Sequence, residues 1–153
     1  MAESRFVYVT YIRTTTEKLW RALLEPEFTR RYWFETWHES EWAPNSPWRL
    51  MLPDGRVGHS GAVVEIEPHR RLVLSWRAEF KPELRAEGHS RVTFELEPQG
   101  DSVKLTVTHQ IDTAESKLVK TLSAGWPHLL ASLKSLLETG EPLAETSRWP
   151  KGL

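Results

Sequence analysis

The clearest hydrophobic pattern of the chain lies in its last third. Between Asp112 and Gly140, leucine and tryptophan recur at steps of three and four residues, at Leu118, Leu122, Trp126, Leu129, Leu133 and Leu137. Side chains at this spacing share one face of an α-helix, and the polar residues Lys120, Ser123, Lys134 and Ser135 lie off that face. The sequence therefore predicts one long amphipathic helix, whose apolar face needs a partner to cover it.

Both ends of this helix carry boundary signals. Asp112 followed by Glu115 matches a capping box, and Gly140 followed by Pro142 matches a helix end. Pro127 lies in the interior, where it lacks the N–H that an α-helix uses, so we expect a bend there.

The first part of the chain predicts a strand followed by two short helices. Residues 5–12, RFVYVTYI, are rich in β-branched and aromatic side chains, as is typical of a strand. Thr14 and Glu17 match a second capping box, which predicts a short helix ending near Glu25. Pro26 suits the first position of another helix, because its missing N–H has no partner there in any case.

The middle of the chain predicts hairpins, because apolar runs alternate with turn residues rich in Pro, Gly, Asn and Asp. We expect six strands, at about 36–42, 48–52, 56–66, 71–80, 89–97 and 102–110. In the last of these, Val103, Leu105, Val107 and His109 share a face that should point inward. The short connections favour antiparallel neighbours.

This order of elements predicts an α+β fold. A curved antiparallel sheet of about seven strands should wrap around the long C-terminal helix, with two short helices between strands one and two. We expect one domain over residues 1–140 and a loose C-terminal tail over 141–153. A chain of 153 residues with 39% hydrophobic residues is long enough to form a single core.

The chain contains, in this order, TTTEKLWRALLEPEFTRRYWF, EPHRRLVLSW, LTVTHQ and GWPHLLASLKSLLETG. These segments resemble the activator of heat-shock-ninety ATPase homologue family, in the START-like (SRPBCC) helix-grip superfamily, over about residues 5 to 140. The resemblance implies a cavity between sheet and C-terminal helix, which in the wider superfamily holds lipids, hormones or polyketides. Asn45-Ser46 stands where many relatives have glycine, and Glu67-Pro68-His69 where many have Asp-Pro-Pro, which weakens any transfer of loop-borne function.

Charge and composition exclude several classes of protein. Twenty Lys and Arg against 21 Asp and Glu leave a formal net charge of -1, which gives no electrostatic reason to expect nucleic acid or an acidic membrane as partner. We find no secretory signal and no apolar run long enough to span a bilayer, so we expect a cytoplasmic protein. The chain has no cysteine, which excludes disulfides and thiolate chemistry.

Eight tryptophans are the unusual feature of the composition. Indole offers a large apolar surface and one N–H, so several of them could line a pocket for a flat apolar ligand, although a purely structural role in the core is the alternative. Trp126 and Trp76 are the better pocket candidates. Trp20 is predicted to be a buried brace, and Trp149, in the tail, to lie at the surface.

The titratable residues give no catalytic signature. His109 should face the cavity, where it could orient a ligand or exchange a proton, but a buried histidine more often serves only as a hydrogen-bond partner. His59 and His128 are weaker versions of the same idea. No metal-binding histidine spacing, serine elbow or nucleotide loop is present, so we expect no metal, no cofactor and no assigned catalytic residue. Glu65, Glu67, Glu95 and Glu97 should form a solvated strand face.

Three functions remain open. The first is binding of a small hydrophobic or aromatic molecule in the cavity, and the second, by family analogy alone, is a cyclase-like or aromatase-like enzyme. A co-chaperone ranks last, because the eukaryotic activators carry an additional N-terminal domain that we do not expect here. The protein should be a monomer or a homodimer. The predicted ligand-binding residues are Trp33, Trp48, His59, Trp76, Phe94, Leu105, His109, Trp126, Leu129 and Leu130.

Overall fold

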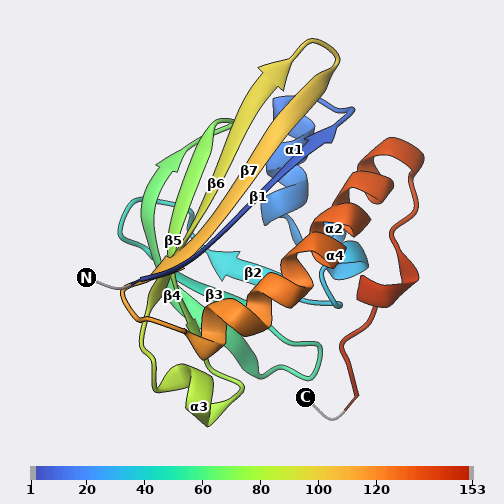
Figure 1. Ribbon diagram of the computed structural model, residues 1–153. Coiled ribbons are helices and arrows are strands. Elements are labelled where there is room, and N and C mark those ends of the chain that lie inside the picture. Colours follow the sequence, from blue (N-terminus) through green and yellow to red (C-terminus); the bar gives the residue numbers. More distant parts are fainter. Residues whose placement is uncertain (1–2, 152–153) are drawn as a thin grey trace.

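The computed structural model describes residues 3–151 (Figure 1). Its strands are β1 (Ser4–Ile12), β2 (Trp37–Ser40), β3 (Pro47–Met51), β4 (Val57–Glu67), β5 (Arg71–Ala78), β6 (Ser90–Gln99) and β7 (Ser102–Ile111). Its helices are α1 (Thr16–Leu24), α2 (Pro26–Tyr32), α3 (Pro82–Arg85), α4 (Lys117–Thr139) and a 3₁₀ turn, η1 (Ala144–Thr146).

All seven strands form one antiparallel sheet in the order β1-β7-β6-β5-β4-β3-β2. Figure 1 shows α4 lying across one face of this curved sheet, with α1 and α2 inserted between the first two strands of the sequence. The main core joins the apolar face of α4 to the inner faces of the strands. The predicted α+β helix-grip fold is therefore confirmed.

The long helix begins later than the sequence pattern indicated. The Ser116 hydroxyl caps it by accepting from the Val119 N–H at 3.1 Å, and the Glu87 carboxylate accepts from the Lys117 N–H at 2.8 Å. The predicted cap at Asp112 is wrong, because β7 continues to Ile111 and the chain needs the next residues to leave the sheet. The predicted end is confirmed, since Gly140 adopts a left-handed conformation with φ of 86°.

The short helices follow the sequence signals with two corrections. Thr15 caps α1 in place of the predicted Thr14, and its hydroxyl accepts from the Lys18 N–H at 3.2 Å. The shift arises because β1 runs to Ile12, so residues 13 and 14 are used to turn the chain. Pro26 begins α2 as predicted. The predicted turn at residues 81–88 contains the helix α3, which the sequence analysis missed.

The outer face of the sheet is largely solvated, as predicted. Arg71 joins Glu65 and Glu95 in exposed ion pairs at 3.2 and 2.8 Å. Thr93 and Thr108 lie on this face but are buried, because they pair with each other across β6 and β7 and have Val73 and Val7 as their other neighbours in the same row. Within residues 3–151, no helix has the length and hydrophobicity needed to cross a membrane.

Candidate functional site

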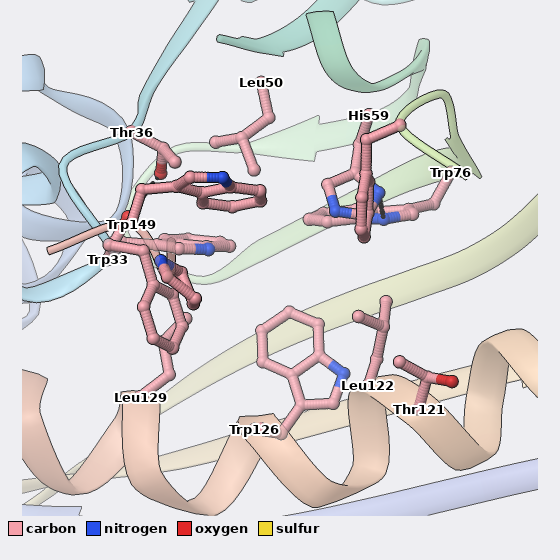
Figure 2. Close-up of a pocket in the computed structure, with 14 residues that line it drawn as sticks. Trp33, Thr36, Leu50, His59, Trp76, Thr121, Leu122, Trp126, Leu129 and Trp149 are labelled. Carbon is pink, nitrogen blue, oxygen red and sulfur yellow. Dashed lines mark hydrogen bonds between the residues drawn. The ribbon is translucent and has the colours of Figure 1, made fainter. Parts of the chain in front are cut away.

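A pocket of about 220 Å³ lies between the sheet and α4 (Figure 2). Most of its lining is aromatic or aliphatic, and four of the eight tryptophans contribute to it. The lining residues are Trp33, Phe34, Thr36, Leu50, His59, Trp76, Phe80, Thr121, Leu122, Gly125, Trp126, Leu129, Trp149 and Pro150.

Gly125 leaves open space beside the pocket where α4 passes over the sheet. Trp126 and Leu129 point from α4 toward the strands, as Figure 2 shows, while Gly125 beside them has no side chain. A Cβ atom added at Gly125 would meet no heavy atom within 4 Å. The gap left at this position is closed on the opposite side by Trp76 of β5 and His59 of β4.

The C-terminal segment covers one side of the pocket. The Trp149 ring packs edge-on against Phe34 and Phe80, with centroid distances of 6.5 and 5.7 Å. The backbone N–H of Phe34 donates to the Thr146 carbonyl at 2.7 Å and so holds this segment in place. The prediction that Trp149 lies only at the surface is therefore wrong, because contacts with residues more than sixty positions away half-bury it.

Four indole rings form a continuous cluster at one wall of the pocket, where Trp33, Trp76 and Trp126 belong to the lining and Trp48 lies behind them. Trp76 lies at its centre, with its ring centroid 4.4 Å from Trp48, 6.3 Å from Trp33 and 5.8 Å from Trp126. Such offset and edge-on contacts add to the energy of burial and leave each ring little freedom. This wall of the pocket is therefore rigid.

Each of three indoles in this cluster donates its N–H to the Nδ1 atom of a buried histidine. The pairs are Trp48 with His38 at 3.0 Å, Trp76 with His59 at 2.8 Å, and Trp126 with His109 at 3.3 Å. An indole can only donate, so each Nδ1 must be unprotonated and each neutral imidazole carries its proton on Nε2. The tryptophans thus fix the tautomer of all three histidines.

Burial keeps these three histidines neutral. It lowers the pKa of His38 and of His59 to about 3, and that of His109 to about 4, because an imidazolium would lose its hydration in this apolar core. The Nε2–H of His109 points to the Ser90 hydroxyl at 2.7 Å, and that hydroxyl donates to the Trp76 carbonyl at 2.9 Å. Among the described residues, the hydrogen bonds of the His109 ring run to Trp126 and Ser90, neither of which is a carboxylate or a phenol.

The predicted site residues divide into two sets. Trp33, His59, Trp76, Trp126 and Leu129 line the pocket. Trp48, Phe94, Leu105, His109 and Leu130 are buried in the core around it and do not reach the lining.

The other lining residues were not among the predicted site residues. Leu122 carried a usable signal, because it lies on the same predicted helix face as Trp126. Phe34 carried none, since it reaches the pocket from a loop in which its own φ is 52°. In the described part of the chain, no three histidine, aspartate or glutamate side chains are grouped so that they could hold a metal ion.

Several solved structures share this fold. The solved structure of DynU16, from the dynemicin biosynthetic locus, has a TM-score of 0.74 at 21% identity, over 95% of this chain and 49% of DynU16. MLL2253 from Mesorhizobium loti has a TM-score of 0.73 at 25% identity, over 88% of this chain and 97% of that one. The Aha1 dimer from Colwellia psychrerythraea has a TM-score of 0.68 at 18% identity, over 90% and 98%. No curated protein matches the sequence.

The sequence itself matches one family over most of its length. The pattern of the Activator of Hsp90 ATPase homolog 1-like proteins matches residues 13–138, from the end of β1 to the last turn of α4. This range includes all the strands after β1 and every lining residue except Trp149 and Pro150. The chain therefore belongs to the family of Activator of Hsp90 ATPase homolog 1-like proteins.

Proposed function

We propose that this protein binds a small hydrophobic or aromatic molecule, without transforming it, in the pocket between the sheet and α4. The observation that carries the proposal is the pocket itself, about 220 Å³ in volume, with four indoles in its wall. Ligand sites in proteins are typically concave, mostly apolar and equipped with a few fixed polar groups. The rigid aromatic cluster on one side supplies such a preformed surface.

The volume limits the ligand to about one or two fused rings. An apolar cavity of roughly 150 Å³ accepts benzene, whereas drug-sized ligands occupy pockets of about 300–1,000 Å³. The pocket volume of about 220 Å³ lies between these values. A larger molecule would require Trp149 and the segment around it to move aside, since this segment forms one wall.

Binding is better supported than catalysis. Proton transfer needs a titratable group with a pKa near the working pH and a partner that orients it. His59 is the one titratable side chain among the described residues of the lining, and burial lowers its pKa to about 3. DynU16 comes from a biosynthetic locus, but the likeness to it, at 21% identity, concerns the fold and adds no catalytic group here.

A fluorescence titration tests the proposal. Binding of 2-naphthol beside Trp33, Trp76 and Trp126 should change the tryptophan emission of the purified protein in a saturable way. Gly125→Phe should abolish this response, because the new ring would grow into the pocket, where a Cβ meets no atom within 4 Å. Gly125→Ala is the matched control, which removes the same glycine but fills little of the space.

Two outcomes would refute the proposal. One is the absence of a saturable response to any one- or two-ring aromatic probe. The other is equal binding by Gly125→Phe and the unmodified protein, which would place the probe elsewhere. Native mass spectrometry of the freshly purified protein is an independent search for a bound small molecule. The cytoplasmic location stays a prediction, as does the oligomeric state, a monomer or a homodimer, and a co-chaperone role stays the last-ranked alternative.

A further inference from the structure

One ring nitrogen of His59 faces the pocket in a fixed direction and has no hydrogen-bond partner among the described residues. His59 is 5% exposed and lines the pocket, and its Nδ1 accepts from the Trp76 indole at 2.8 Å. Its Nε2 has no hydrogen-bond partner among residues 3–151, and it is not sealed from the pocket by other atoms. Figure 2 shows His59 beside Trp76 at one end of the pocket, with the bond between them dashed.

The hydrogen bond from Trp76 determines whether His59 Nε2 is a donor or an acceptor. Because Nδ1 is used as an acceptor, the single proton of the neutral ring resides on Nε2, which is therefore a donor. The neighbouring rings hold this donor in place: Trp76 lies 5.0 Å and Phe80 5.4 Å from the His59 centroid. The pKa of His59, lowered to about 3 by burial, keeps the ring neutral at physiological pH.

The remaining polar groups of the lining offer little to a ligand that donates hydrogen bonds. The Thr36 hydroxyl is committed to the Trp33 carbonyl at 2.5 Å. The Trp149 indole N–H also has no partner, but its nitrogen is sealed by surrounding atoms and does not open to the pocket. No acidic side chain lines the pocket among the described residues. The Thr121 hydroxyl, at the exposed edge of the lining, can donate or accept. The Nε2–H of His59 is thus the fixed donor that faces the pocket, and the group that completes it must be an acceptor.

We propose that the pocket selects planar aromatic molecules that carry a hydrogen-bond acceptor, such as an aza nitrogen or a ring carbonyl, placed against the Nε2–H of His59. This inference rests on the proposed function, because it specifies the ligand class of the same pocket. It names His59 as the residue that determines specificity. Purely hydrocarbon rings leave that donor unpaired, and cationic amines bring a charge to a lining that has no acidic side chain among the described residues.

Three two-ring probes of similar shape test the proposal. Naphthalene has no polar atom, quinoline has one acceptor, and indole has one donor. The quantity to measure is the ratio of the dissociation constants of naphthalene and quinoline, by fluorescence or calorimetric titration near pH 7.5. Comparing this ratio between variants cancels the difference in hydrophobicity of the two probes.

The informative variant is His59→Asn. Its amide oxygen lies where it can still accept from the Trp76 N–H, while the donor at the Nε2 position is gone. We expect the preference for quinoline over naphthalene to fall by about tenfold, the size of one net hydrogen bond. His38→Asn is the matched control, since it makes the same change in the equivalent Trp48 pair outside the pocket lining, and it should leave the ratio unchanged.

A spectroscopic measurement on the unmodified protein does not depend on whether a variant folds. In a long-range ¹⁵N–¹H spectrum, the His59 resonances should show the Nε2–H tautomer and should shift on addition of quinoline. An equal probe ratio in the unmodified protein and His59→Asn, or indole binding as tightly as quinoline, would overturn the inference and leave the pocket proposal standing. If none of the three probes binds, the proposed function fails and the inference fails with it.

Discussion

Mild acid should destabilise this protein through its three buried tryptophan–histidine pairs. His38, His59 and His109 are 6%, 5% and 0% exposed. Their pKa values in the folded chain lie at about 3, 3 and 4, whereas an unperturbed histidine titrates at 6.5. Between these values the unfolded chain binds more protons than the folded one, so the free energy of unfolding falls with falling pH. The contribution is fully present above pH 6.5 and is lost progressively below it.

The magnitude at pH 5 follows from the unfolded pKa alone. That pH is 1.5 units below 6.5 and still above the folded values, so each histidine lowers the free energy of unfolding by about 2 kcal/mol. Three histidines together give about 6 kcal/mol, a large part of the roughly 5–15 kcal/mol of a typical domain. Carboxyl groups with lowered pKa, such as Glu79 and Glu138, lose their contribution only below about 4.5 and fall outside this range.

Urea unfolding at pH 7.5, 6 and 5, followed by circular dichroism and tryptophan fluorescence, measures the loss. His38→Asn keeps an acceptor for the Trp48 N–H but cannot take up a proton, so the loss should shrink from about 6 to about 4 kcal/mol. His89→Asn, at an exposed histidine, should leave it unchanged. A free energy at pH 5 within about 1 kcal/mol of that at pH 7.5 would show that burial does not keep these rings neutral.

Three further predictions concern substitutions at single positions. Leu133 is fully buried between α4 and the sheet, so Leu133→Ala should cost about 2–5 kcal/mol in urea melts, and a loss below about 1 kcal/mol would contradict its place in the core. Gly61→Ala would bring a Cβ to 1.9 Å from the Ser75 carbonyl oxygen, so calorimetry should show a lower melting temperature, whereas Gly125→Ala should raise it slightly. His109→Gln should change the affinity for quinoline by no more than about tenfold, because His109 lies outside the lining; a much larger loss would assign it a direct role.

Much of the fold was readable from local pattern. The steps of three and four residues along α4, the alternation along β7 and the stop at Gly140 all depend on residues close together in the sequence. These signals also predicted correctly that Trp126 and His109 point inward, since the phase of a helix or strand fixes which face a side chain occupies. The starts of α1 and α4 were predicted wrongly. Thr14 and Asp112 are residue types that can cap a helix, but β1 and β7 run so far that the helices begin later, after Thr15 and Ser116.

The pocket was decided by the tertiary structure. Trp149 becomes a wall because two bonds hold its segment down, from the Phe34 N–H to the Thr146 carbonyl and from the Leu143 N–H to the Ser132 hydroxyl at 2.8 Å. The sequence alone therefore determined the sheet, the long helix and the face that each presents. The cavity depends on how separate segments fill the space between those faces, and hydrophobic periodicity carries no information about a contact between residues so far apart in the chain.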